Sequence, residues 1–319
     1  MTTNNQHWMS LVAGREIQLP RRERLQDLID SRAFFDSIAD VSDLPENVTV
    51  EEVVLREREG KKLTAEIYVP SGKGPFPLWL HIHGGGWCVG SAMNDRKLAM
   101  RYAQRGYVVA SIDYALAPEH PFPWAVEDAL YSLRWLSLHG SDFGGDIDRV
   151  VIEGGSAGAN LAVAAMLAQD GSPLELDEGD LAGISVNVSA AILSYGVFDF
   201  VKLLLEPGSN VGSAELWARG YLGPHFTTRL REPLASPVYS ESLSSLPPCY
   251  LNCGSQDSLL GHTLSLGDRL AASHVPVTLS VIAGADHGML KAADSLPLAA
   301  EEIDHMFEWV TRQLADGQQ

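Results

Sequence analysis

The chain has 319 residues, which is enough for about two domains or for one large α/β unit with insertions. It carries 23 Lys and Arg against 41 Asp and Glu, a formal net charge of −18. A charge of this sign repels phosphate backbones and anionic lipid surfaces, and this argues against nucleic acid or a membrane as a partner.

Leader-like and membrane-spanning patterns are missing, and cysteines are scarce. Residues 1–7 lack a cationic segment followed by an apolar one, and the longest uncharged apolar stretch, Leu161 to Ala168, is far shorter than a bilayer is thick. Three cysteines, Cys88, Cys249 and Cys253, are too few for a disulfide framework. We therefore expect a soluble, cytoplasmic protein with reduced thiols.

In chain order, the first patterned region lies within residues 1–45, where Leu25, Leu28 and Ile29 recur at helical spacing beside several arginines. From about residue 60 onward, short apolar runs alternate with helix-length amphipathic segments. The alternation of residues 63–69 predicts a half-exposed strand.

Further strands and helices follow in turn. The expected strands are 78–82, 108–112, 150–152, 190–193, 250–251 and 277–282. The expected helices are 94–104, 125–138, 157–169, 262–272 and 299–314. This alternation predicts an α/β fold whose mostly parallel sheet is covered by helices on both faces.

Two segments stand outside the alternation: residues 1–45 and residues 200–236. Residues 200–236 are rich in aromatics and in residues that break helices, and a segment of that length between two strands is typical of a lid or binding segment. The acidic stretch from Glu175 to Asp180 is expected to be a solvated loop.

A glycine-flanked serine lies between an expected strand and an expected helix. Residues Gly154 to Gly158 spell G-x-S-x-G around Ser156. A nucleophilic serine needs a sharp, strained strand-to-helix turn, and only very small neighbours let the two elements pass closely. The alternative is a simple glycine-rich turn, but the flanking strand and helix favour the nucleophile.

A second glycine run, His83-Gly84-Gly85-Gly86-Trp87, follows the strand at 78–82. Acyl transfer creates an oxyanion, which is stabilised by backbone N–H groups at about 2.7–3.1 Å, and glycine allows the backbone to come this close. The run fits the H-G-G-G oxyanion signature of lipases and esterases.

A serine nucleophile requires a base and an acid later in the chain. Of the histidines beyond residue 260, only His287 lies in a glycine-flanked loop directly after an expected strand. Asp257, which follows the strand at 250–251, is the leading acid. Asp199 is its rival, whereas Asp286 is disfavoured because adjacent side chains in a loop rarely face each other.

His81 and His83 together form an H-x-H pair that could suggest a metal site. With a glycine run directly after the pair and no further ligand nearby in sequence, we expect no metal there.

Several ordered motifs resemble the hormone-sensitive-lipase-like branch of α/β-hydrolases, the bacterial H-G-G-G esterases. Besides the two glycine motifs, the run Asp113 to Pro123 is similar to D-Y-R-L-A-P-E-x-x-F-P, and Leu246-Pro247-Pro248 and Asp257-Ser258-Leu259 are similar to L-P-P and D-P-L. The resemblance spans about residues 60–315 and implies an α/β-hydrolase fold with a helical cap.

The resemblance also implies roles for individual residues. It makes Ser156 the nucleophile, with Asp257 as acid and His287 as base, and it makes the N–H groups of Gly85, Gly86 and Ala157 the oxyanion donors. Relatives use no cofactor, prefer esters with short to medium acyl chains, and are commonly dimers.

The chain departs from the family pattern at a few positions. Gly155 stands where the family elbow has an aspartate, Ala115 replaces the family arginine, and the acid motif D-P-L-R-D retains only Asp257 and Leu259. These changes bear on the substrate class more than on the reaction.

The domain plan follows from the same likeness. We expect a cap drawn from residues 1–45 and 200–236 above a hydrolase core made of residues 46–199 and 237–319. Four aromatic residues are candidates to line the substrate pocket, although core packing would explain each of them equally well: Trp87, Phe198, Trp217 and Tyr221.

The expected function is hydrolysis of neutral carboxylic esters by a serine carboxylesterase. A lactonase, or an amidase such as an arylformamidase, would use the same groups. A hydrolase-fold receptor that only binds a ligand is disfavoured because His287 is present. The charge of −18 also makes anionic substrates less suitable than neutral esters.

Overall fold

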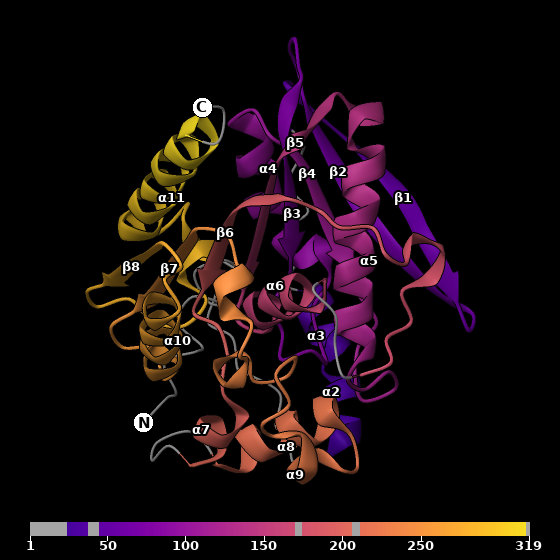
Figure 1. Ribbon diagram of the computed structural model, residues 1–319, viewed down its shortest axis with the longest axis vertical. Helices are drawn as coiled ribbons and strands as arrows, with labels where there is room; N and C mark the ends of the chain where they lie inside the picture. Colours follow the sequence, from indigo (N-terminus) through magenta and orange to yellow (C-terminus); the bar gives the residue numbers. More distant parts are fainter. Residues whose placement is uncertain (1–23, 38–44, 170–173, 206–210, 317–319) are drawn as a thin grey trace.

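The computed structural model describes residues 24–37, 45–169, 174–205 and 211–316. Its strands are β1 (Val48–Arg58), β2 (Lys61–Pro70), β3 (Phe76–Ile82), β4 (Val108–Asp113), β5 (Gly145–Gly155), β6 (Val188–Ser194), β7 (Cys249–Gly254) and β8 (Val277–Ile282). They form an eight-stranded sheet in the order β1-β2-β4-β3-β5-β6-β7-β8 (Figure 1). The strands from β4 to β8 in that order run parallel, whereas β1 pairs with β2, and β2 with β4, in the antiparallel sense.

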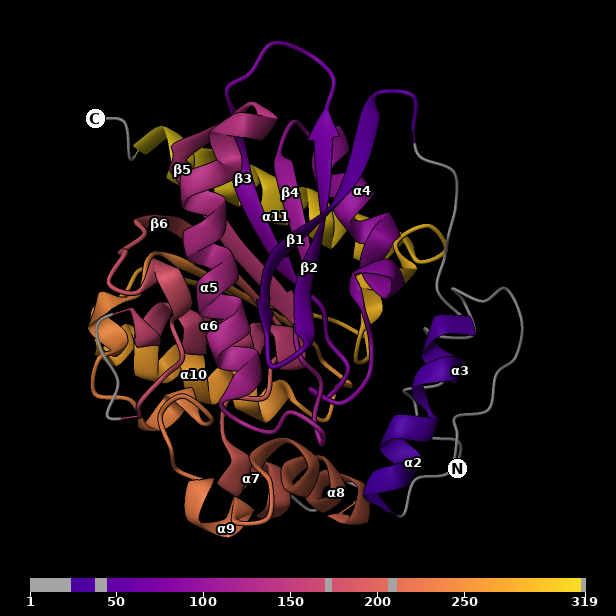
Figure 2. The same cartoon turned by 90° about the vertical axis from the view of Figure 1, so that its right-hand side faces the viewer.

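Helices cover both faces of this sheet. The longer ones are α4 (Arg96–Gln104), α5 (Trp124–His139), α6 (Ala157–Ala168), α10 (Leu260–Ala272) and α11 (Pro297–Asp316). Helices α5, α6 and α10 pack on one face, and α4 and α11 pack on the other (Figure 2). Every residue of α6 is buried, because its side chains are small or apolar on all sides. The expected α/β architecture is confirmed.

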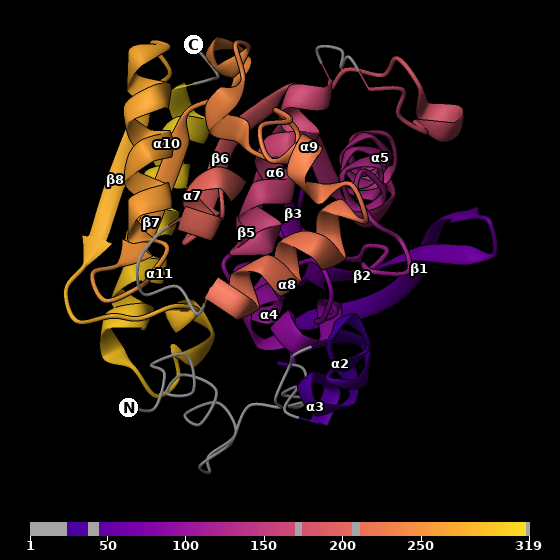
Figure 3. The ribbon, with the colours of Figure 1, turned by 90° about the horizontal axis from the view of Figure 1, so that it is seen from below.

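The remaining helices gather across the carboxyl end of the parallel strands. They are α2 (Leu25–Asp30), α3 (Arg32–Ser37), α7 (Phe200–Leu205), α8 (Val211–Leu222) and α9 (Phe226–Arg229). Helix α2 lies beside α8, although nearly 200 residues separate them in sequence (Figure 3). At their contact a Cβ on Gly220 would lie 3.2 Å from the Leu28 side chain. The two segments outside the strand and helix alternation therefore meet in space.

Arg32 fastens α3 to the core. Its guanidinium forms a bidentate ion pair with the Glu119 carboxylate, with both N···O distances at 2.7 Å. It also donates to the backbone oxygens of Cys88 at 2.8 Å and Ala117 at 2.9 Å. One side chain thus joins an N-terminal helix to the two loops that follow β3 and β4.

Short 3₁₀ helices complete the described chain. They are η1 (Ala92–Asp95), η2 (Gly140–Phe143), η3 (Gly179–Leu181), η4 (Pro237–Tyr239), η5 (Leu243–Ser245) and η6 (Met289–Ala292). The three cysteines are buried and free, as their number predicted.

Two expectations about strands need correction. Strand β1 was not expected, because its charged residues break the alternation; Arg56 and Arg58 are nevertheless mostly buried, paired with Asp128 and Glu127 of α5. Strand β2 was expected to be half-exposed, but residues 65–68 are all buried because the helical layers cover both faces.

The acidic stretch is also more than a solvated loop. Asp177 pairs with Arg58 at 3.2 Å, Glu178 pairs with Arg134 of α5, and Asp180 accepts a hydrogen bond from the hydroxyl of Tyr131. These carboxylates hold the loop against β1 and α5, so their role is structural.

Candidate active site

The turn between β5 and α6 holds Ser156 in a strained conformation. Its φ is 56° and its ψ is −117°, in a region that residues with a side chain rarely adopt. A Cβ on Gly154 would lie 2.4 Å from the backbone carbon of Gly158, and one on Gly158 would lie 1.9 Å from the carbonyl oxygen of Ile82. Both flanking glycines are therefore required by close backbone contacts, in agreement with the sequence argument.

Ser156, His287 and Asp257 form a continuous hydrogen-bonded chain. The Ser156 Oγ lies 3.0 Å from the His287 Nε2, and the His287 Nδ1 lies 2.8 Å from the Asp257 Oδ2. The other carboxylate oxygen of Asp257 accepts the backbone N–H of Leu259 at 2.8 Å. Because a carboxylate only accepts, the proton of the neutral imidazole sits on Nδ1, and Nε2 is free to accept from the serine.

The surroundings of His287 and Asp257 set the charge of each of these two side chains. Burial alone would lower the pKa of His287, but the charge and hydrogen bond of Asp257, together with Asp286, raise it above its ordinary value. Burial would raise the pKa of Asp257, but His287 and the Leu259 N–H hold it below its usual range. Asp257 is thus a carboxylate that supports a positive charge on His287.

The two rival acids have other partners. Asp199 accepts the backbone N–H groups of Val201 at 2.9 Å and Lys202 at 3.0 Å, and so caps α7. Asp286 accepts the backbone N–H of His287 at 2.7 Å rather than its imidazole. Of the three candidate aspartates, only Asp257 reaches the ring of the histidine.

The glycine run after β3 forms a tight turn beside Ser156. The φ angles of Gly85 and Gly86 are 120° and 56°, and a Cβ on Gly85 would lie 2.0 Å from the carbonyl oxygen of Val89. A Cβ on the preceding Gly84 would lie 3.3 Å from that of Ser156. Among the described residues, no acceptor takes the backbone N–H of Gly85, Gly86 or Ala157.

The four pocket candidates fall into two groups. Trp87, Phe198 and Tyr221 are 1%, 0% and 0% exposed, and the rings of Trp87 and Tyr221 stack with centroids 4.3 Å apart. Core packing therefore accounts for these three in this structure. Trp217 differs because it is only partly buried and lies against the glycine turn, where a Cβ on Gly86 would be 2.5 Å from its ring.

Tyr195 was not among the sequence candidates, yet it packs against His287. Their ring centroids are 5.1 Å apart at an interplanar angle of 70°. A Cβ on Gly155 would lie 3.0 Å from the Tyr195 ring and hydroxyl. The departure of Gly155 from the family aspartate was the available signal, since a glycine leaves room for this tyrosine.

His81 and His83 take unrelated roles. The His83 Nδ1 lies 2.7 Å from the Gly84 carbonyl oxygen, and its ring stacks on Tyr114. His81 lies between two carboxylates in the core, those of Glu153 and Asp95. Within the described ranges, no three His, Cys, Asp or Glu side chains are grouped so that they could hold a metal.

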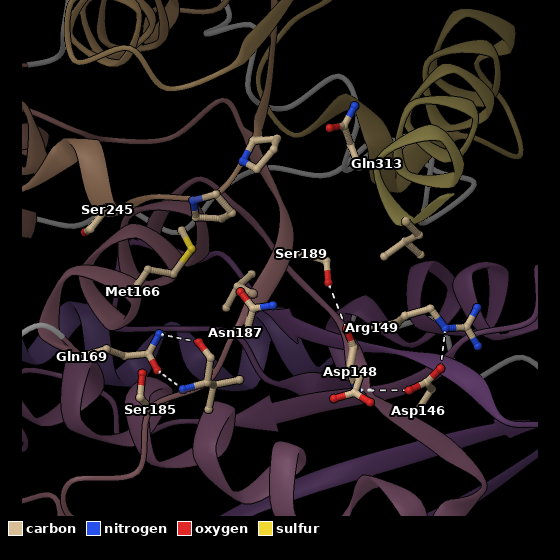
Figure 4. A pocket seen from close by; sticks show the side chains of 15 residues that line it. Asp146, Asp148, Arg149, Met166, Gln169, Ser185, Asn187, Ser189, Ser245 and Gln313 are labelled. Carbon is tan, nitrogen blue, oxygen red and sulfur yellow. Dashed lines mark hydrogen bonds and ion pairs between the residues drawn. The ribbon is translucent and has the colours of Figure 1, made fainter. Parts of the chain in front are cut away.

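A cavity of about 870 Å³ lies elsewhere, at the amino ends of β5, β6 and β7 (Figure 4). Its lining includes Asp146, Arg149, Gln169 and Asn187, but no member of the serine, histidine and aspartate chain. Because the glycine turn and Ser156 are at the carboxyl ends of the strands, this cavity is not part of the candidate active site.

Comparisons with known proteins agree with the fold and the motifs. A sequence profile described as alpha/beta hydrolase fold matches residues 79–291. The chain belongs to the α/β-hydrolase family. This α/β-hydrolase is 32% identical over 238 residues to the esterase LipI of Mycobacterium tuberculosis, a match that covers 70% of this chain and 69% of LipI.

Further relatives support the same class. The carboxylic ester hydrolase LipN of Mycobacterium tuberculosis is 33% identical over 273 residues, which cover 83% of the α/β-hydrolase and 70% of LipN. The solved structure titled bacterial heroin esterase has a TM-score of 0.79 at 26% identity and covers 96% of this chain and 97% of that one. These matches confirm the expected class of enzyme, a carboxylic ester hydrolase, and its resemblance to the hormone-sensitive-lipase-like branch.

No helix within the described residues is both long and apolar enough to cross a membrane.

Proposed function

We propose that this α/β-hydrolase cleaves neutral carboxylic esters through an acyl-enzyme on Ser156. The observation that carries the proposal is the hydrogen-bonded chain from Ser156 Oγ through His287 to Asp257. In it, the hydroxyl is in contact with an imidazole nitrogen that can accept its proton, and the opposite nitrogen is held by a buried carboxylate.

The first half of the reaction forms the acyl-enzyme. The Ser156 oxygen attacks the ester carbonyl carbon while its proton moves to the His287 Nε2. The carbonyl oxygen becomes an oxyanion, for which the N–H groups of Gly85, Gly86 and Ala157 are the proposed donors because no acceptor in the described protein takes them. The C–O bond then breaks, and the leaving alcohol takes the proton from His287.

The second half returns the enzyme to its starting state. Water gives a proton to the His287 Nε2 as its oxygen attacks the acyl carbon, and the new tetrahedral species collapses. Ser156 leaves with the proton from His287, and a carboxylic acid is released. Asp257 keeps its negative charge throughout and stabilises the imidazolium that forms twice per cycle.

The preference for short to medium acyl chains is part of the proposal and rests on the family resemblance. Trp217 is the side chain best placed to affect it, because its ring covers Gly86 at the proposed oxyanion turn. A lactonase or amidase would use the same atoms, so assays with lactone and anilide substrates beside esters decide among these activities.

We also propose a cap, because α2 and α8, which come from the two segments outside the alternation, are in contact. Residues 1–45 contribute α2 and α3, and residues 200–236 contribute α7, α8 and α9, all at the carboxyl end of the sheet (Figure 3). Residues 1–23 and 38–44 of this segment lie outside the described residues. A homodimer and a cytoplasmic location stay predictions from the sequence.

Replacing Ser156 tests the proposal. We expect Ser156→Ala to lower kcat for p-nitrophenyl esters by on the order of 10⁴ to 10⁶, because the attacking oxygen is lost. The assay uses p-nitrophenyl esters of increasing chain length beside lactone and anilide substrates. Ser189→Ala, a serine at the cavity far from the site, is the matched control and should keep wild-type activity. Substantial esterase activity in Ser156→Ala would refute the assignment.

A further inference from the structure

A group of charged side chains is buried in the core, on elements adjacent in sequence to the proposed catalytic segments. His81, Asp95 and Glu153 are 1%, 3% and 1% exposed, and they come from β3, η1 and β5. Lys291 of η6 joins them, with 19% of its side chain exposed. Burying charges is costly unless they are paired, so a group of four in the core calls for a reason.

The four side chains form one connected chain of contacts. The sheet register places His81 directly opposite Glu153, and the His81 Nδ1 lies 2.5 Å from the Glu153 Oε2. The His81 Nε2 lies 3.1 Å from the Asp95 Oδ2. Lys291 forms an ion pair with the other oxygen of the same Asp95 carboxylate.

Three members of this cluster, His81, Glu153 and Lys291, lie close in sequence to a proposed catalytic segment. His81 precedes the turn that starts at His83, Glu153 is three residues before Ser156, and Lys291 is four residues after His287. Three loops from distant parts of the sequence are therefore attached to one buried cluster.

We propose that Lys291 is a positioning residue for His287: it fastens the loop that carries the imidazole to Asp95 and, through His81 and Glu153, to the strands that carry the glycine turn and Ser156. This inference rests on the proposed function, because it assigns Lys291 to the same site. Lys291 does not touch the reacting atoms; it acts through the position and the charge of His287.

Contacts within the cluster favour the charged forms of His81 and Asp95. Burial would lower the pKa of His81, but Glu153 and Asp95 together raise it to about 9, so His81 is a cation at neutral pH. Lys291 and His81 hold the pKa of Asp95 below its usual range, against the effect of burial. Lys291 and His81 are thus two cations in contact with the buried carboxylate of Asp95, and loss of Lys291 would remove one of them.

Lys291 also acts on His287 directly. The imidazole is in contact with Ser156, with Asp257 from the loop after β7 and with Tyr195 from the end of β6. The charges of Asp286 beside it and of Lys291 from η6 also act on it. The two aspartates favour the protonated ring, whereas the positive charge of Lys291 opposes it. Without that charge, a larger fraction of His287 would be protonated and unable to act as a base.

The test measures the pKa of His287 by NMR in protein labelled with ¹³C at the histidine Cε1, with the signal assigned from its loss in His287→Gln. We expect Lys291→Met to raise this pKa by about half a pH unit or more and Lys291→Arg to leave it near the wild-type value. In ester hydrolysis, Lys291→Met should lower kcat about 10-fold or more with little change in KM, and Lys291→Arg should restore most of it.

Lys97→Met is the matched control. Lys97 of α4 pairs with Asp294 just after η6, but at a far more exposed position, so its loss should change neither readout. An unchanged His287 pKa in folded Lys291→Met, or an equal change in Lys97→Met, would overturn the proposal. The NMR titration does not depend on turnover, so it decides the role of Lys291 even if Ser156→Ala were to show that the proposed reaction is wrong.

Discussion

A single proton on His287 controls whether the proposed site is active. The base must be neutral, and the pKa of His287 lies above its ordinary 6.5 because Asp257 and Asp286 outweigh the effect of burial. Protonation therefore removes the base as the pH falls through a value above 6.5. We expect kcat/KM for a p-nitrophenyl ester, measured between about pH 5 and 9, to rise along one limb with its midpoint in that region.

Asp257→Asn provides the comparison for this profile. Removing the carboxylate takes away the largest group that raises the His287 pKa, so the midpoint should move to lower pH while kcat falls by on the order of 10⁴. A midpoint that stays in place in Asp257→Asn would show that the limb reports another group.

Residues that belong to a local sequence motif could be predicted from the sequence. Residues whose role depends on contacts between segments distant in sequence could not. Gly154 is confined by the backbone of its own turn and Gly158 by the carbonyl oxygen of Ile82, and the local G-x-S-x-G motif around Ser156 records both requirements. Tyr195 meets His287, and Lys291 meets Asp95, only because the fold brings distant segments together, so no local pattern marks them.

At the scale of elements, Arg32 makes the ion pair that attaches the N-terminal helices to the core. Its four hydrogen bonds to Glu119 and to the backbone oxygens of Cys88 and Ala117 lie on the two loops that follow β3 and β4. Arg32→Ala should free α3 and expose Phe34 and Phe35 to chymotrypsin, at a cost in global stability of about 1–2 kcal/mol. Limited proteolysis followed by mass spectrometry gives the rate of cleavage there.

Arg24→Ala is the control for this experiment. Arg24 pairs with Asp27 at the start of α2, at a highly exposed position, so its loss should leave the cleavage rate near that of wild type. Equal cleavage rates at Phe34 in wild type and Arg32→Ala would contradict the proposed attachment.

Most elements were predictable because their apolar pattern matches how they are buried. The parallel strands β3 to β8 and helices α4, α5, α6, α10 and α11 agree with the expected ranges to within a few residues, except that β5 runs from Gly145 to Gly155 and is much longer than the expected 150–152. Strand β1 was missed because Arg56 and Arg58 read as exposed, whereas ion pairs with α5 bury them. Ion pairing between distant elements has no local sequence signal.

For the whole molecule, the buried cluster ties the stability of the fold to pH. The pKa of His81 is about 9 in the folded protein and about 6.5 in an unfolded chain, so folding favours its protonated form. This stabilisation is complete below about pH 6.5, declines as the pH rises toward 9, and amounts to about 3 kcal/mol. The guanidinium concentration at the midpoint of unfolding should therefore decrease as the pH is raised from about 6.5 to about 8.5.

His81→Gln isolates this effect, because glutamine retains hydrogen bonding without a charge that titrates. Its unfolding midpoint should be lower than that of wild type at about pH 6.5 and should change less over the same range. Parallel pH dependences in the two proteins would show that the decline comes from other groups.

The central claim is that His287 activates Ser156 as a nucleophile, and a fluorophosphonate probe tests it most directly. The claim predicts one phosphonyl adduct per chain, found by peptide mass mapping on the peptide with Ser156. The adduct should be absent in Ser156→Ala and form far more slowly in His287→Gln. An adduct on another residue, or undiminished labelling in Ser156→Ala, would contradict the claim.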